Sequence, residues 1–202
     1  GYNKPLIEQY FIFLKRITFY GDWGYSEKLY TARPVWDVFV SKLPATMYVN
    51  ILAMVFSVPL GLGCGIFAAL KKNKWQDHLV NILVMLFISV PSYVYAFLVQ
   101  YFLCYKLGWF PFDMDSGSNY FSWSMFISVV PAVLSLSFGT IAGLTRFTRA
   151  ELTEVLTSDF MLLARTKGLT RAQATSRHAL RNAMVPIFPS ILGQFIGIIG
   201  GS

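Results

Sequence analysis

The chain has 202 residues, of which 55% are hydrophobic and only 13% are charged. This charged fraction is about half of what a soluble domain usually carries, so the composition excludes an ordinary soluble protein and predicts an all-α, polytopic membrane protein. Because the sequence starts at Gly1 without an initiator Met and stops within an apolar run, we expect it to be a fragment of a longer chain.

Residues 1–43 mix apolar and charged side chains. Leu6, Tyr10 and Leu14 fall near one face of a helix, and the charged residues between them exclude a membrane crossing. A turn-like Gly-Asp-Trp-Gly sequence follows, and Pro34 then favours the start of a second short helix. We therefore predict an extracytoplasmic amphipathic segment.

Residues 44–202 are predicted to form the membrane domain, with spans at about 44–70, 79–105, 120–145 and 183–202. The first three spans contain no Asp, Glu, Lys, Arg or His. Each is long enough to cross a hydrocarbon core about 30 Å thick.

Each of these three spans also contains a proline, at Pro59, Pro91 and Pro131, where we expect the helix to break. A proline frees a backbone carbonyl that must find water or a neighbouring helix. Pro59, Pro91, Ser92 and Pro131 are therefore candidates for lining or gating a path through the membrane. Irregular packing is the alternative explanation.

The distribution of positive charge predicts the orientation. The loop 71–78 holds three lysines, whereas the loop 106–119 holds Lys106 together with two aspartates, and the segment 146–182 holds seven more cations. Cytoplasmic loops carry an excess of Lys and Arg, so 71–78 and 146–182 are predicted to be cytoplasmic and 106–119 external. Residues 1–43 are then external as well, although they hold six cations.

The most polar part of the membrane domain is 158–185, where we predict two short helices that meet at Gly168. Ser158 is the expected N-cap of the first helix, and Gly168 is free to adopt the left-handed conformation that ends many helices. Thr170 and Gln173 have the spacing of a capping box. Pro186 predicts a boundary or kink.

The second helix of this pair divides into a basic face and a face of small residues. The small face is suited to close docking, which favours a protein partner. The basic face holds Arg171, Arg177, His178 and Arg181, and the small face holds Ala172, Thr175, Ser176, Ala179 and Ala183.

Other functions leave different signatures. Clustered arginines are typical of nucleic-acid binding, but apolar spans on both sides tie this segment to the bilayer, so we expect no nucleic acid; a loop that contacts only lipid is the other alternative. A proton-coupled transporter needs an ionisable group within the membrane, and none of the three complete spans has one, although the missing spans keep this alternative open.

An intramembrane enzyme would need a nucleophile with a partner, and Ser57, Ser89 and Ser92 have no His or Asp at their depth. The sequence also contains no phosphate-binding glycine loop, nucleophile elbow or metal-ligand cluster. We predict no catalytic, cofactor or metal site.

Residues 164–186, ARTKGLTRAQATSRHALRNAMVP, resemble the cytoplasmic coupling motif of the permease subunits of bacterial ABC transporters. The resemblance is to the peptide and nickel importer family, in which a glycine is followed by nine residues and then by His-x-Leu-Arg-Asn. Gly168, His178, Leu180, Arg181 and Asn182 match this pattern, whereas the general Glu-Ala-Ala at its start is replaced by residues 162–164, Leu-Leu-Ala.

The resemblance extends over nearly the whole chain. KPLIEQY at 4–10, GDWGYS at 21–26, RPV at 33–35, LPAT at 43–46 and ISVPSY at 88–93 are similar to the first-subunit permeases of oligopeptide and dipeptide importers.

This resemblance implies a subunit of about six spans in a bacterial inner membrane, of which the chain would supply the second to the fifth. It would pair with a second permease, receive substrate from an extracellular solute-binding protein and be driven by two cytoplasmic ATPases, which bind the ATP, so the chain itself would not be an enzyme. The substrate class, peptide, nickel or another small solute, stays open. The implied ATPase-coupling residues are Ala164, Arg165, Lys167, Gly168, His178, Leu180, Arg181 and Asn182.

Overall fold

The computed structural model describes residues 4–27, 30–117 and 119–197, apart from the side chains at positions 160, 165 and 171. The described residues form helices and one isolated β-bridge, between Tyr25 and Pro34, which confirms the prediction of an all-α protein. The chain divides into two compact units, Gly1–Thr46 and Met47–Ser202.

The first unit contains α1 (Leu6–Tyr20), which ends at Gly21 in the left-handed conformation (φ 62°). No residue of α1 is buried within the chain. Asp22 accepts hydrogen bonds from the Gly24 N–H, at 2.9 Å, and from the Arg16 guanidinium. These two donors hold the pKa of Asp22 below its ordinary value, because they stabilise the carboxylate.

The helix α2 (Val35–Leu70) is continuous over 36 residues. The expected separate short helix after Pro34 was therefore wrong, as was the expected break at Pro59. Residues on both sides of Pro59 are apolar, and a helix of this kind tolerates the loss of one backbone hydrogen bond because neighbouring helices support it. The same correction applies to Pro131, which lies inside α5 (Trp123–Leu156).

Pro91 does interrupt its helix. α3 (Trp75–Ser89) ends at Val90, whose backbone is extended, and the chain restarts as α4 (Ser92–Val99) and the π-helical turn η1 (Gln100–Lys106). The axis bends by 97° between α3 and the helix at 92–106. Of the three expected breaks, this one is confirmed.

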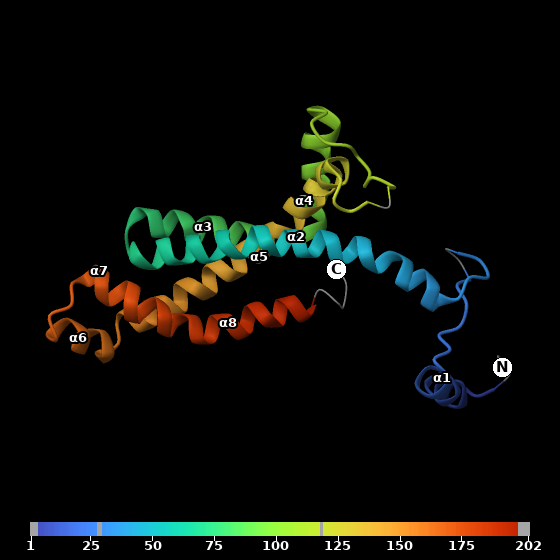
Figure 1. Cartoon of the computed structure of the whole chain (residues 1–202), viewed down its shortest axis with the longest axis horizontal. Coiled ribbons are helices and arrows are strands. Elements are labelled where there is room, and N and C mark those ends of the chain that lie inside the picture. The colour runs from blue at the N-terminus through green and yellow to red at the C-terminus, as the bar shows by residue number, and fades with distance from the viewer. Residues whose placement is uncertain (1–3, 28–29, 118, 198–202) are drawn as a thin grey trace. The chain divides into compact units, whose positions relative to one another are not determined.

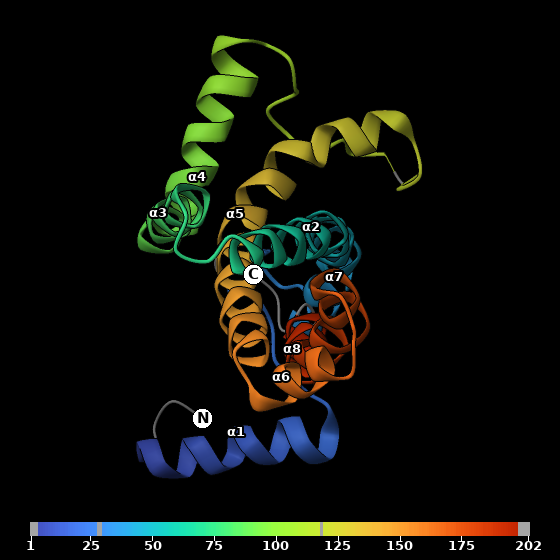
Figure 2. The same ribbon diagram turned by 90° about the vertical axis from the view of Figure 1, so that its left-hand side faces the viewer.

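In the second unit, α5 is the central helix, with α3 and α4 on one side and α2 and α8 (Leu180–Gly197) on the other (Figures 1 and 2). α5 continues well beyond the expected end of its span at 145. Of the described helices, α2 and α5 are long and apolar enough to cross a membrane, and the bent pair at 75–106 makes a third crossing if it counts as one span.

The last described helix begins earlier than expected and has no boundary at Pro186. α8 follows directly on α7 (Arg171–Ala174) and the π-helical turn η2 (Thr175–Ala179), and it continues through Pro186 and Pro189. The expected second short helix is therefore the beginning of a long one. The end of the predicted fourth span, 198–202, lies outside the described residues.

Two glycines allow α2 and α5 to approach closely. A Cβ at Gly61 would lie 2.9 Å from the Leu144 Cβ, and one at Gly65 would lie 2.6 Å from the Thr148 Cβ. The Thr145 hydroxyl donates a hydrogen bond to the Gly61 carbonyl at 3.2 Å. Small residues at these positions therefore place the two backbones in contact, as is common between membrane helices.

Candidate coupling surface and membrane path

In the polar segment, two helices meet at Gly168 as expected, although the second of them is the start of a long helix. α6 (Asp159–Thr166) is followed by Gly168 in the left-handed conformation, with φ 85°. The capping box of the next helix is complete: the Thr170 N–H donates to Gln173 Oε1 at 3.1 Å, and the Gln173 N–H donates to Thr170 Oγ1 at 3.3 Å. Leu169 packs against the core. These expectations are confirmed.

Ser158 directly precedes α6, as expected of its N-cap, but its hydroxyl does not cap the helix. Its hydroxyl donates backwards to the Val155 carbonyl at 2.7 Å, and the Met161 N–H bonds to the Ser158 carbonyl. Because α5 ends just before Ser158, the free carbonyls of its last turn compete for this hydroxyl.

Only part of the small-residue face is buried inside the chain, since Ala172 and Ser176 are exposed. Ala174 and Ala179 are fully buried, and Thr175 and Ala183 nearly so. Ala174, Ala179 and Ala183 form one cluster with residues of α2, α5 and α6. The buried part of the face docks within the chain, so only Ala172 and Ser176 remain available to the predicted protein partner. The cluster includes Ala69, Leu144, Leu152, Met161, Ala164, Ala174, Ala179, Ala183 and Ile187.

This burial divides the predicted coupling residues into two groups. Ala164 is buried, and His178 and Leu180 are half-buried. Lys167, Gly168, Arg181 and Asn182 are exposed. The side chain of Arg165 lies outside the described part of the chain.

The sequence reasoning missed two leucines at this surface. Leu162 is 63% exposed and Leu163 is 55% exposed, whereas Met161 and Ala164 on either side of them are buried. Buried residues at i and i+3 of a helix direct the two between them outward, so this spacing could have indicated the exposure. We use "coupling surface" for the exposed residues of the pair, which include Leu162, Leu163, Lys167, Gly168, Arg181 and Asn182.

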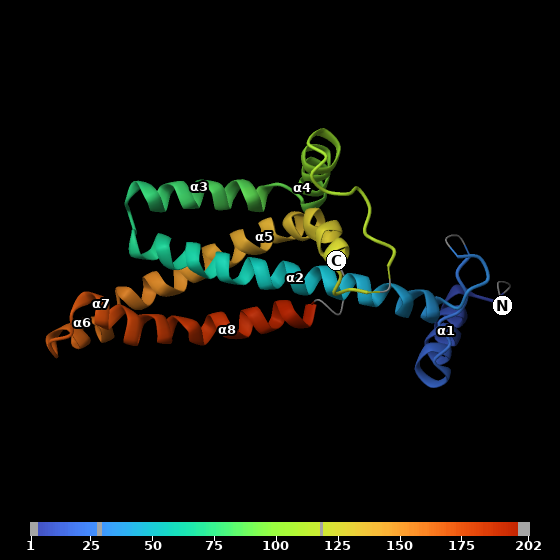
Figure 3. The ribbon, with the colours of Figure 1, turned by 45° about the horizontal axis from the view of Figure 1, so that its top comes forward.

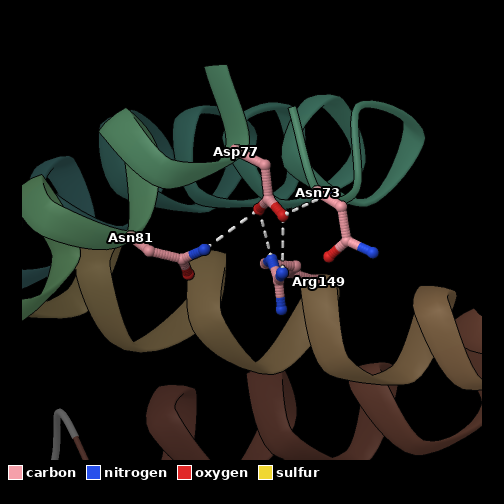
Figure 4. Close-up of polar contacts among 4 residues, drawn as sticks. All are labelled: Asn73, Asp77, Asn81 and Arg149. Atoms are coloured by element: carbon pink, nitrogen blue, oxygen red, sulfur yellow. Dashed lines mark hydrogen bonds and ion pairs between the residues drawn. The ribbon is translucent and has the colours of Figure 1, made fainter. Parts of the chain in front are cut away.

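A buried ion pair fixes the neighbouring part of the molecule (Figure 4). The Arg149 guanidinium donates two hydrogen bonds to Asp77, from Nε at 2.5 Å and from Nη2 at 2.7 Å. The Asn73 N–H and the Asn81 side chain each donate to the same carboxylate at 3.0 Å. Asp77 is 1% exposed, so all of its charge is balanced by donors from the chain.

This pair also was missed, because Arg149 was counted only as one of the cations that set orientation. It joins the first turn of α3 to α5, about two helical turns before α5 ends at Leu156. Figures 1 and 3 show the α2–α3 turn at the same end of the second unit as α6 and α7. The ion pair therefore fixes α3 to α5 near the end of the unit that carries the coupling surface.

The candidate path residues do not meet in one place. Pro59, Pro91 and Ser92 are exposed, and Pro131 is buried in α5. A cavity of about 400 Å³ lies instead between α2, α5 and α8, lined in part by Asn50, Thr140 and Gln194 and with Ser57 in its wall. Ser57 is 0% exposed and its hydroxyl has no partner among the described residues.

In the described residues, no three His, Cys, Asp or Glu side chains lie close enough together to hold a metal ion. Cys64 and Cys104 are both unpaired thiols. The polar groups of the coupling surface can bind a partner through hydrogen bonds and charge, and those of the cavity beside Ser57 can bind a solute through hydrogen bonds.

Comparison with known proteins identifies a family of membrane components, in agreement with the long apolar helices. Residues 61–202 match the family of binding-protein-dependent transport system inner membrane components. The chain is 36% identical over 202 residues to the dipeptide transport system permease protein DppB of Lactococcus lactis, covering 100% of this chain and 63% of that protein.

Two further relatives are similar over the same extent. The oligopeptide transport system permease protein OppB of Haemophilus influenzae is 34% identical over 200 residues, which cover 99% of this chain and 63% of that protein. The glutathione transport system permease protein GsiC of Escherichia coli K12 is 34% identical over 203 residues, which cover 100% of this chain and 62% of that protein. The chain thus spans less than two thirds of the length of these relatives, and it belongs to the family of inner membrane components of binding-protein-dependent transport systems.

Proposed function

We propose that the chain is part of the permease subunit of an ATP-driven importer, and that it forms the translocation path for peptides or related small solutes. The observation that carries this proposal is the match to permeases over the whole chain, since the named relatives transport a dipeptide, an oligopeptide and glutathione. The subunit itself would not be catalytic, because ATP would be hydrolysed by partner subunits.

The proposed partners follow from the same family. They are a second permease subunit, two cytoplasmic ATPase subunits, an extracellular solute-binding protein and the surrounding lipid bilayer. Only the ATPases would contact the coupling surface directly. Its exposed leucines, Leu162 and Leu163, supply apolar contact area, and Lys167 and Arg181 supply charge at the edge.

The helix pair is suited to transmitting force. Its inner face is packed against α5 and α2, and its second helix continues into α8 without interruption. Movement of an ATPase against the coupling surface would therefore displace α5 and α8 rather than be absorbed in a loop. Ala164 is buried and Leu180 is half-buried, so in this scheme they position the helix pair and do not contact the ATPase.

Along the path, the cavity beside Ser57 offers hydrogen-bonding groups without charge, which suits the polar backbone of varied peptides. Among the proline candidates, Pro91 with Ser92 is the one at an actual break between helices, so we assign gating there in preference to Pro59 and Pro131.

Substitution of Gly168 tests the coupling role. A Cβ at Gly168, where φ is 85°, meets no described atom within 4 Å, so Gly168→Val acts through backbone strain of roughly 1 to 2 kcal/mol and through the partner surface. We expect the full-length variant to insert normally but to lose ATPase association, uptake or both. Gly168→Asn should lose less, because Asn tolerates this conformation.

The matched control is Gly108→Val. Gly108 has φ 63° and equally open surroundings, but it lies in the loop predicted to be external. Normal uptake in this control would show that strain alone is not responsible. Stoichiometric ATPase binding and a normal import rate in Gly168→Val would refute the coupling role.

A further inference from the structure

A second cavity lies beside the coupling surface. It has a volume of about 760 Å³ and is formed where the turn after α2, the end of α5 and the start of α7, η2 and α8 meet. Lys71, Lys72 and Lys74 line it, together with Thr153. This cavity is separate from the one beside Ser57.

The three lysines are uncompensated. No side chain in the described part of the chain forms a salt bridge with any of them, and the neighbouring acid, Asp77, is already bound to Arg149. Glu154 lies next to Thr153 on α5 but does not line the cavity and forms no ion pair with described residues. The cavity therefore attracts an anion.

A buried hydroxyl points to the same conclusion. Thr153 Oγ1 is inaccessible to solvent and has no hydrogen-bond partner among the described residues. A buried polar atom without a partner costs free energy, and because Thr153 lines the cavity, a rotation of its side chain would let an oxygen of a ligand there satisfy the hydroxyl. The remaining wall is partly apolar, with Leu70 and Leu156 among its residues.

The surroundings indicate that this anion belongs to the bilayer. Lys71 directly follows a helix apolar enough to cross a membrane, and Trp75 nearby is 70% exposed, as is usual for Trp at the level of lipid headgroups. The volume is far larger than an inorganic phosphate needs, and an apolar wall would be of no use to such an ion.

We propose that this cavity binds the phosphate headgroup of an anionic phospholipid, with Lys71, Lys72 and Lys74 around the phosphate and the apolar wall against the first carbons of the acyl chains. Basic pockets between membrane helices bind anionic headgroups in this way. A lipid here would contact both the α2–α3 turn and the first turns after Thr170, and so would brace the coupling surface. The inference goes beyond the proposed function and does not depend on the substrate.

The test uses the full-length subunit in its purified complex, with bound lipid measured by native mass spectrometry. Phosphatidylglycerol should bind in preference to phosphatidylcholine, and added salt should weaken it. In the triple variant Lys71→Gln, Lys72→Gln, Lys74→Gln, affinity should fall roughly fivefold for each lysine removed. The matched control is Lys4→Gln, Lys15→Gln, Lys42→Gln, which makes the same charge change outside the cavity and should bind as the unmodified protein does.

Several outcomes would overturn the proposal. Equal binding of the two lipids, or equal losses in the triple variant and its control, would show that the cavity is not a lipid site. Inorganic phosphate that displaces the lipid at equal concentration would identify a site for free anions instead. Loss of the ATPases from the triple variant with lipid binding unchanged would identify a protein interface. If the triple variant does not assemble, the lipid preference and salt dependence of the unmodified complex decide the question.

Discussion

The Asp77 carboxylate is a buried charge close to the end of a membrane helix, so the fold must supply hydrogen-bond donors to it in place of water. It accepts four hydrogen bonds, two from Arg149 on α5 and one each from Asn73 and Asn81, which lie four residues away along the chain. Removing one partner of a buried ion pair usually costs more than the pair itself contributes, since the other charge is left without compensation.

We predict that Asp77→Asn lowers the stability of the subunit by about 3 kcal/mol, at the lower end of the usual range because the Arg149 side chain is 25% exposed and keeps some contact with water. The measurement is thermal unfolding of the purified full-length protein. The double variant Asp77→Asn, Arg149→Met should recover part of this loss, because no unpaired cation is left.

The control for this prediction is Asp113→Asn, an exposed aspartate in the loop 106–119 without a salt bridge to any described residue. It should unfold at the same temperature as the unmodified protein. A double variant no more stable than Asp77→Asn would mean that the pair acts through its geometry and not through charge compensation.

Among the helices, the contact between α2 and α5 depends on glycine at two positions. We predict that Gly65→Ala destabilises the protein by about 1 to 3 kcal/mol, since its Cβ would also lie 2.8 Å from the Thr145 carbonyl oxygen, and a backbone atom cannot move aside as a side chain can. Thermal unfolding of the full-length variant measures the effect.

Gly63 provides a matched control on the same helix, because a Cβ there meets nothing within 4 Å. Gly63→Ala should be neutral or slightly stabilising, as expected for Gly to Ala in a helix. Equal destabilisation by the two substitutions would attribute the effect to the helix backbone and would contradict close packing at Gly65.

Local features of the site could be predicted from the sequence, and features that depend on packing could not. The left-handed Gly168 and the capping box at Thr170 depend on a few neighbouring residues, and both are present. The hydroxyl of Ser158 and the continuous helices through Pro59 and Pro131 depend on what surrounds them. No spacing in the sequence relates Asp77 to Arg149, because they are 72 residues apart.

At the scale of the second unit, the α2–α3 turn lies at the end that carries α6 and α7 (Figure 3). The lysines of the second cavity lie in this turn, and Asp77 of the ion pair follows directly in the first turn of α3. The opposite ends of α2 and α5 are held by a different cluster, which includes Met125 and Val129. The cavity beside Ser57 lies between α2, α5 and α8, and it is lined partly by residues of this second cluster, such as Ala53.

The orientation of this end in the membrane gives the last prediction. The lysines of the loop 71–78 and the cations after α5 predict that both segments are cytoplasmic and that the loop 106–119 is external. Single cysteines at Lys74, Gln173 and Ser116, in a background with Cys64 and Cys104 replaced by Ala, should test this with a membrane-impermeant thiol reagent. All three positions are exposed within the chain, so in permeabilised cells each should react unless a partner subunit covers it. In intact cells with the outer face accessible, only the cysteine at position 116 should react, because the bilayer separates the other two from the reagent. Labelling at position 74 or 173 in intact cells would reverse the orientation and, with it, the access of cytoplasmic ATPases to the coupling surface.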